Sequence, residues 1–281
     1  MHHAKLGFVT AAFLVDTLAL FVMAFRWRVL LHSLRSSATY FETLLAYSAG
    51  VCVCNITPAR AVGGDACRAA LIPRPNGSPP LKAIGASVVY DRASDVAGFL
   101  MLCVLALPRL RPQSPHWGLV ALIAVGAVLV AGPLYRRLIS RIGRWHLALV
   151  GNEFGTSVAA ALGCSLVIWT LDITRIMLVA HAFGVRLVPS QAATVSLLRL
   201  GSGLVPIPGG IGVVDSALVA GFVWLGVPTA TAAAMAIVER AIVYGWSTAL
   251  GATALMLLGG SRALKQARTA SAAATSSDIA S

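Results

Sequence analysis

The feature that most constrains this chain is a series of apolar runs long enough to cross a lipid bilayer as helices. A crossing helix needs about 20 predominantly apolar residues, and the sequence supplies such runs at 8–25, 86–107, 117–134, 158–183 and 229–258. The composition agrees, because only 11% of the 281 residues are charged, whereas soluble domains carry about 25%. The sequence therefore predicts an all-α, polytopic integral membrane helical bundle with about five full spans.

Basic residues in the short loops set the predicted orientation of these spans. The net charge is +12, and Lys and Arg in short loops mark the cytoplasmic side of a membrane protein. Loops 26–39, 73–85 and 135–146 and the C-terminal tail together carry twelve basic residues, against four on the other side. We therefore expect a bacterial-type plasma membrane protein with a disordered cytoplasmic tail over 260–281. The charge needs no nucleic-acid partner to explain it.

Two further apolar stretches are interrupted by proline and glycine. Under this orientation residues 40–72 begin and end in the cytoplasm, and residues 191–226 begin and end outside. The first stretch is broken by NITPARAVGGD and the second by PIPGGIG. We expect each to form a re-entrant hairpin of two short helices, and the two hairpins to enter the membrane from opposite faces.

The hairpins and the spans after them suggest an internal repeat. Each of these spans carries an acid–arginine pair. The separation from Pro58 to Asp91 is 33 residues, the same as from Pro206 to Glu239. The alternative is coincidence, because Pro and Gly-Gly are common in membrane helices.

The predicted repeat units cover about residues 40–107 and 191–258, within a single transmembrane domain over 1–259. The orientation places the two units upside down relative to each other. Inverted repeats with broken helices that meet near the bilayer midplane are typical of transporters.

Short helices that start inside the membrane would direct unpaired N–H groups and a positive dipole end into the protein. Such ends bind phosphate or carboxylate groups. We expect half-helices at 65–72 and 213–225, and the glycines that would open them are Gly63, Gly64, Gly209, Gly210 and Gly212. The alternative is that Asp65 and Asp215 merely cap their helices.

Thirteen charged residues fall at membrane depth, where each costs at least about 2.5 kcal/mol unless it is paired or hydrated. Asp172 and Arg175, and likewise Arg92 and Asp95, have the i,i+3 spacing of a pair on one helix face, whereas Asp16 has no evident partner. The set either is a purely structural network or lines a polar cavity for a charged headgroup. Its members are Arg60, Arg68, Arg92, Arg175, Arg199, Arg240, Asp16, Asp65, Asp91, Asp95, Asp172, Asp215 and Glu239.

Motifs that would indicate an enzyme are weak. Asp91 and Asp95 form D-x-x-x-D, but the longer aspartate patterns of membrane prenyltransferases and alcohol phosphotransferases are missing. No G-x-S-x-G motif occurs, and His181 is the one histidine within a predicted span. The five cysteines lack the spacing of a zinc site or a disulfide framework. We expect no catalytic activity, no cofactor and no metal.

Several motifs together resemble a known family, the flippase-like membrane region of lysylphosphatidylglycerol synthases. They are Arg26-Trp27-Arg28, PARAVGGDACR at 58–68, VVYDRASD at 88–95, PIPGGIGVVD at 206–215 and VERAIVYGW at 238–246. The resemblance covers about residues 8–260, as in stand-alone members that lack the synthase domain. Asp65 and Asp215 stand where the family usually has Glu, which shortens their reach. The family usually has one more span before Arg26, so either the start differs or this helix is lacking.

The resemblance implies translocation of an anionic or lipid-linked amphiphile between bilayer leaflets. Substrates suggested within the family are aminoacylated phosphatidylglycerol, polyprenyl-phosphate glycans and hopanoid-like lipids. Membrane lipids are therefore the expected partners, and enzymes of lipid or glycan pathways are further candidates. The expected substrate-binding residues are Pro58, Arg60, Gly63, Gly64, Asp65, Arg68, Asp91, Arg92, Asp95, Pro208, Gly209, Gly210, Gly212, Asp215, Glu239 and Arg240.

Two other functions remain open at this point. The protein could be a membrane scaffold subunit of a lipid or glycan pathway that transports nothing, in which case its intramembrane charges would form a dry, fully self-paired network. It could also be an integral membrane transferase, which would need a metal ion between Asp91 and Asp95.

Overall fold

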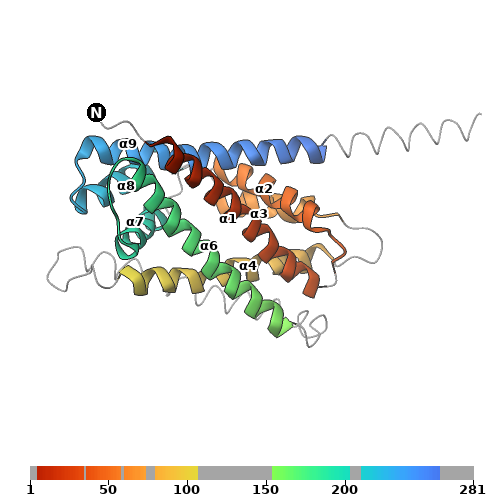
Figure 1. The fold of residues 1–281 in the computed structure, drawn as a ribbon. Coiled ribbons are helices and arrows are strands. Elements are labelled where there is room, and N and C mark those ends of the chain that lie inside the picture. Colours follow the sequence, from red (N-terminus) through yellow and green to blue (C-terminus); the bar gives the residue numbers. More distant parts are fainter. Residues whose placement is uncertain are drawn as a thin grey trace, which may run out of the picture.

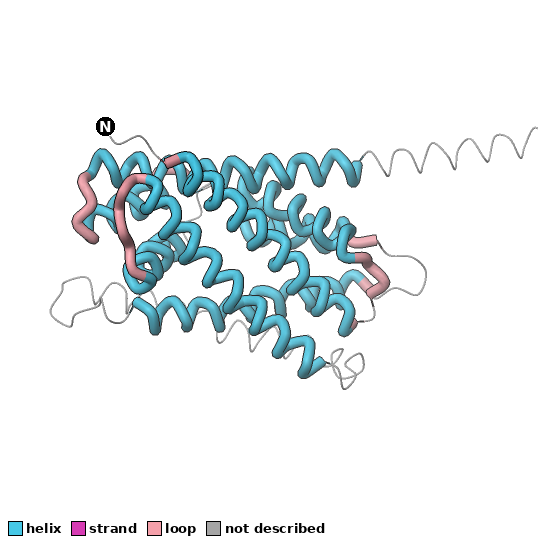
Figure 2. Tube along the Cα trace, in the orientation of Figure 1, coloured by secondary structure: helices cyan, strands magenta, loops and turns pink. Residues whose placement is uncertain are grey.

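The computed structural model describes residues 5–34, 36–57, 60–73, 80–106, 154–202 and 210–259. Every regular element in this part of the chain is helical, which confirms the all-α prediction (Figures 1 and 2). The elements are α1 (Leu6–Ser33), α2 (Tyr40–Ile56), α3 (Arg60–Leu71), α4 (Leu81–Ala106), α6 (Phe154–Ala182), α7 (Pro189–Ser202), α8 (Val213–Trp224), α9 (Thr229–Arg240) and the π-helical turn η3 (Ala241–Trp246).

Among the described residues, three helices are long and apolar enough to cross a membrane. They are Leu6–Ser33, Thr156–Ala182 and Thr229–Gly259, and they coincide with three of the predicted spans. The predicted span at 86–107 falls on α4, which has 26 residues but carries charged residues in its middle. The predicted span at 117–134 lies outside the described residues, so the count of five spans stays a prediction.

Helices α1 and α6 pack along each other through the middle of the molecule (Figure 1). Small and branched side chains allow this approach, and the core around them includes the fully buried Ala12 on α1, Ile176 on α6 and Leu102 on α4. A second apolar cluster lies on the other part of α1, where Trp27 packs with Tyr47 of α2 and Ile84 of α4. Between these two cores α1 carries the polar residues Asp16 and Thr17.

The first hairpin consists of α2 and α3. It begins with a capping box, in which Thr39 Oγ1 accepts a hydrogen bond from the N–H of Glu42 at 3.3 Å and Glu42 Oε2 accepts one from the N–H of Thr39 at 2.8 Å. The two helices then approach closely at Gly50 and Gly64, since a methyl group added to Gly50 would lie 2.8 Å from the Gly64 carbonyl oxygen.

The position of the helix start in this hairpin corrects a prediction. The glycine pair does not open a half-helix at residue 65, because α3 already begins at Arg60 and contains both glycines. Gly63 and Gly64 instead let α3 lie against α2: a Cβ on Gly63 would come within 2.9 Å of Thr57 Oγ1. Asp65 therefore lies inside a helix and is not at its N-cap.

The second hairpin consists of α7 and α8. Helix α8 begins at Val213, directly after Gly210 and Gly212, whose φ angles of 63° and 82° favour glycine. Asp215 Oδ2 accepts a hydrogen bond from the Gly212 N–H at 2.8 Å. Asp215 therefore caps the N-terminus of α8. Pro206, Pro208 and Gly209 lie outside the described residues, as does Pro58 in the first hairpin.

The last helix changes its pitch partway along. It continues from α9 through the π turn η3 and returns to α-helix up to Gly259. The side chains of this turn bind neighbouring helices: Trp246 Nε1 donates to Thr17 Oγ1 of α1 at 2.9 Å, and the Tyr244 hydroxyl donates to the Asn55 carbonyl of α2. The π turn therefore joins the last helix to both α1 and α2.

Candidate functional site

A set of ion pairs around a buried centre, which we call the α4 cluster, joins α1, α3 and α4. Its members are Arg26, Arg68, Arg92, Asp65, Asp91 and Asp95. At its centre Asp91, which is 0% exposed, accepts hydrogen bonds from Arg26 Nε at 2.7 Å and from Arg68 Nη1 at 2.8 Å. Three guanidinium groups face three carboxylates, so the α4 cluster is electrically balanced.

The pairing within the α4 cluster differs from the local prediction. Arg92 does not pair with Asp95 on its own helix but reaches α3, where its Nε and Nη2 donate to Asp65 at 2.9 and 2.8 Å. Asp95 instead accepts from Arg26 Nη1 of α1. An i,i+3 spacing allows a pair on one helix, but here both groups find partners on neighbouring helices.

Arg68 is held in one orientation by aromatic rings. Its guanidinium carbon lies 4.8 Å from the centre of the Trp27 ring and 4.7 Å from that of Tyr47, within the range of cation–π attraction. Trp27 is itself fixed, because its Nε1 donates to Ser87 Oγ at 2.9 Å. The Arg68 side chain is only 2% exposed.

A second buried set, the α6 cluster, surrounds Arg175. Its members are Asp16, Asp172, Arg175, Ser196, Arg199, Glu239 and Ser247. Arg175 donates to Glu239 at 2.7 Å, to Asp172 at 2.7 Å and to Asp16 at 3.1 Å. The predicted Asp172–Arg175 pair is thus confirmed, and Asp16 has a partner that lies 159 residues further along the chain.

The α6 cluster is not balanced in charge. It contains three carboxylates but only two guanidinium groups, those of Arg175 and Arg199. Hydroxyl groups supply further donors: Ser247 Oγ donates to Asp16 at 2.9 Å, and Ser196 Oγ donates to Asp172.

The two clusters share a pairing pattern. In the α4 cluster, Arg26 of the helix before the hairpin binds Asp91, 65 residues later. In the α6 cluster, Arg175 of the helix before the other hairpin binds Glu239, 64 residues later. The neighbouring arginine of each acid also returns to its hairpin. Arg92 binds Asp65, and Arg240 binds Asp215 at 3.2 Å.

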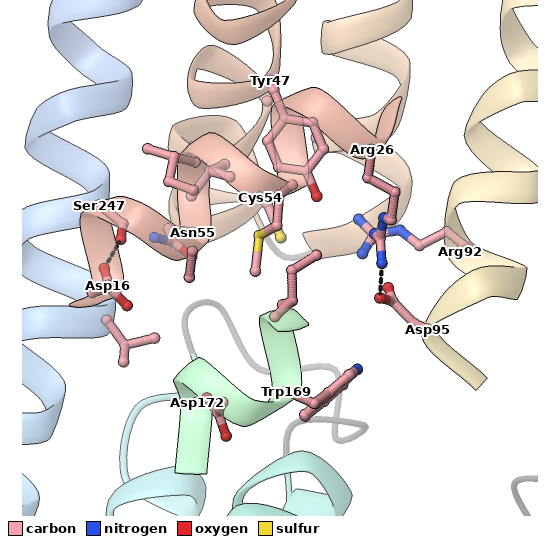
Figure 3. Close-up of a pocket in the computed structure, with 18 of the residues that line it drawn as sticks. Asp16, Arg26, Tyr47, Cys54, Asn55, Arg92, Asp95, Trp169, Asp172 and Ser247 are labelled. Carbon is pink, nitrogen blue, oxygen red and sulfur yellow. Dashed lines mark hydrogen bonds and ion pairs between the residues drawn. The ribbon is translucent and has the colours of Figure 1, made fainter. Parts of the chain in front are cut away.

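A cavity of about 350 Å³ lies between the two clusters and is lined by both (Figure 3). Figure 3 shows Asp16 and Ser247 on one side of it, Arg92 and Asp95 on the other, and Trp169 at its edge. The cavity takes its lining from α1, α2, α3, α4, α6, α7 and the last helix.

The cavity divides the predicted site residues into groups. Those that line it are Gly64, Asp65, Arg68, Arg92 and Asp95. Asp91 and Glu239 do not line the cavity, but they bind Arg26 and Arg175, which do. Gly63, Gly210, Gly212, Asp215 and Arg240 are not part of the lining. Pro58, Pro208, Gly209 and the side chain of Arg60 lie outside what the structure describes.

Several lining residues were not among the predicted site residues. Four of them stood out in the sequence only as charges at membrane depth: Asp16, Asp172, Arg175 and Arg199. The signal that could have selected them is the free-energy cost of a charged side chain inside the membrane. Asn55 and Trp169 also line the cavity. Both are unremarkable in an apolar sequence, and only the packing of the helices brings them to the site.

Comparison with known proteins agrees with the membrane architecture. The family model of the lysylphosphatidylglycerol synthase transmembrane region matches residues 1–251. A UPF0104 membrane protein of Methanothermobacter thermautotrophicus is 25% identical over an alignment of 292 residues, gaps included. The alignment covers 90% of this chain and 86% of the relative. Another from Methanocaldococcus jannaschii is 24% identical, with coverage of 89% and 84%. No solved structure matches the chain significantly.

Proposed function

Because the chain belongs to the lysylphosphatidylglycerol synthase transmembrane family, we propose that it moves an anionic or lipid-linked amphiphile between the two leaflets of the membrane. The observation that carries this proposal is the cavity between the α4 and α6 clusters. A headgroup that crosses the hydrocarbon core needs polar groups to replace its water, and this cavity offers charged side chains from five helices, α1, α3, α4, α6 and α7.

The exposure of the lining supports transport over a scaffold role. A scaffold would have a dry and self-paired charge network, whereas Arg92 is 45% and Asp95 is 30% exposed in this structure. Both side chains also line the cavity. Charges that stay partly open at the depth of a membrane span are costly and mark substrate or ion pathways.

A transferase is disfavoured by the position of one side chain. Arg26 binds both Asp91 and Asp95, so a guanidinium group already joins the two carboxylates that would have to share a metal ion. Asp91 is completed by Arg68 on its other oxygen.

The shared pairing pattern supports the inverted repeat as part of this proposal. We extend the predicted units, about 40–107 and 191–258, by the preceding helices α1 and α6, because Arg26 and Arg175 make equivalent pairs with Asp91 and Glu239. Two similar units that face a cavity near the midplane from opposite orientations would allow access to alternate between leaflets. As part of the same proposal, the protein lies in the plasma membrane with its C-terminus on the cytoplasmic side, as the basic residues of the loops predict.

A topology experiment tests this arrangement. Single cysteines at Gly77 and Thr229, placed in a cysteine-free background, should react with a membrane-impermeant maleimide from opposite sides of the membrane. The orientation predicts that Gly77 is labelled only after the cytoplasmic face is opened, because its loop carries basic residues. Labelling of both positions from one side would refute the inverted repeat.

Translocation itself is tested in proteoliposomes that contain a fluorescent anionic phospholipid and an impermeant quencher. The wild-type protein should expose the lipid of the inner leaflet to the quencher, and Arg92→Ala should slow this at least about tenfold, because a charge-assisted contact to the headgroup contributes about 1.5–3 kcal/mol. Arg28→Ala is the matched control, since Arg28 donates to the Ala38 carbonyl and does not line the cavity.

Two other outcomes would contradict the proposal. Equal translocation by the wild-type and Arg92→Ala proteins would remove the cavity from the pathway. Absence of translocation with any anionic lipid would favour the scaffold function.

A further inference from the structure

Four buried side-chain N–H groups in the described part of the chain have no hydrogen-bond partner. They are Arg68 Nε, Arg68 Nη2, Trp169 Nε1 and Arg199 Nε. All four are donors, and all three residues line the same cavity. Native proteins leave few buried polar groups without a hydrogen-bond partner, so each exception needs an explanation. The simplest is that a ligand supplies acceptors at this position.

We propose that Arg68, Trp169 and Arg199 form an oxyanion site that binds the phosphate of the transported headgroup; the proposal rests on the function proposed above. A phosphate group presents only acceptor oxygens when it is fully ionised, which complements a set of unpaired donors. A cation would find the opposite situation, because no buried side-chain oxygen of the described residues is left unpaired.

Arg68 is the best prepared of the three. Its Nη1 is engaged by Asp91 and its ring neighbours Trp27 and Tyr47 fix its plane. Its Nη2 forms an ion pair with Asp65 Oδ1 at 3.0 Å, although the two atoms lack the geometry of a hydrogen bond. The Nε–Nη2 edge of a guanidinium is the side that binds a phosphate or carboxylate through two parallel bonds. The plane of the Arg68 guanidinium is therefore fixed before any ligand arrives, with Nε free of a hydrogen-bond partner and Nη2 beside Asp65.

Arg199 and Trp169 supply donors from the other unit. Arg199 uses its Nη2 on Asp172 at 2.6 Å and leaves its Nε unpaired. Trp169 lies on α6, and its indole packs against Gly98 of α4, where any side chain larger than hydrogen would collide with it. An anion bound to Arg68 of α3 and to these two residues would bridge the two units.

The available space fits this assignment. A cavity of about 350 Å³ has room for roughly ten water molecules at about 30 Å³ each. A phosphate with part of its headgroup fits within that volume, and Trp169 N–H adds a neutral donor whose loss does not change the charge of the site.

The test measures binding to the purified full-length protein in detergent by isothermal titration calorimetry. The ligands are dihexanoyl phosphatidic acid, dihexanoyl glycerol, which lacks the phosphate, and inorganic phosphate. We expect the phosphatidic acid to bind and the diacylglycerol to bind at least about tenfold more weakly, because hydrogen bonds to a charged group are the strong ones. Trp169→Phe should weaken phosphatidic acid about tenfold and leave the diacylglycerol unchanged.

Matched variants keep the result interpretable. Trp246→Phe removes an indole N–H that already has Thr17 as acceptor and should bind as the wild type does. Arg68→Lys keeps the charge but lacks the two-donor edge, and it should weaken phosphatidic acid at least as much as Trp169→Phe. Should Arg68→Lys fail to fold, Trp169→Phe alone decides.

Wild-type affinity of Trp169→Phe for phosphatidic acid would overturn the proposal, and so would equal affinities for phosphatidic acid and the diacylglycerol. Inorganic phosphate that binds as tightly as the lipid would identify free phosphate as the ligand and overturn the assignment to a lipid headgroup. Binding that behaves as expected in a protein that translocates nothing would refute the proposed function and leave the oxyanion site standing.

Discussion

Asp91→Asn is expected to destabilise the protein by about 3–5 kcal/mol, the cost of removing one partner from a buried ion pair. Asp91 is fully buried and is the acceptor for both Arg26 and Arg68. The amide that replaces it has the same size but no charge, so two buried guanidinium groups would lose their shared counter-ion. Arg26 would keep Asp95, whereas Arg68 would keep only Asp65.

The measurement is thermal unfolding of the detergent-solubilised protein, with Asp215→Asn as control. Asp215 pairs with Arg240 at 3.2 Å but its side chain is 37% exposed, and Asn retains the ability to cap a helix. An exposed pair of this kind contributes up to about 1 kcal/mol. Equal destabilisation by the two substitutions would show that the α4 cluster is not the centre of the fold that we describe.

Arg175→Met is expected to destabilise the protein by a similar amount, about 3–5 kcal/mol. Here carboxylates lose a shared guanidinium counter-ion, whereas in Asp91→Asn guanidinium groups lose a shared carboxylate. Arg175 is the shared counter-ion of Asp16, Asp172 and Glu239. Its removal leaves Arg199 as the single guanidinium group of the α6 cluster, against three carboxylates. Each carboxylate is held by a different helix or turn, so the repulsion would act to separate α1, α6 and α9.

A double variant separates this repulsion from the loss of packing. Adding Glu239→Gln to Arg175→Met removes one of the uncompensated charges, and coupling energies between contacting residues reach about 3 kcal/mol. The double variant should therefore recover at least about 2 kcal/mol of unfolding free energy relative to Arg175→Met, measured by chemical denaturation in the same detergent. Strict additivity of the two substitutions would contradict the ion-pair geometry.

The sequence predicts the long elements of this fold because their signal is local. Apolar runs of about 20 residues define α1, α6 and the last helix without any knowledge of partners. The start of α3 was predicted wrongly for a physical reason. Glycine both interrupts helices and permits close packing, and Gly64 serves the second purpose against Gly50.

The site could be predicted only where its contacts repeat or are short in sequence. The Asp172–Arg175 pair follows from its i,i+3 spacing, and the equivalent positions of Asp91 and Glu239 follow from the repeat. The contact of Asp16 with Arg175 joins residues 159 positions apart, and its existence depends on how α1 packs on α6. Trp169 gives no sequence signal at all, because an indole in an apolar helix ordinarily packs in the core.

The π turn η3 has a consequence for the phase of the last helix. Glu239 contacts Arg175, and Ser247, eight positions later, contacts Asp16 in the same cluster. In an uninterrupted α-helix, positions eight apart point about 80° away from each other around the axis. A π turn takes up one extra residue, which makes these two positions equivalent to a pair seven apart, about 20° from alignment. The bulge therefore acts as an angular spacer that brings both ends of this helix segment to one charged site.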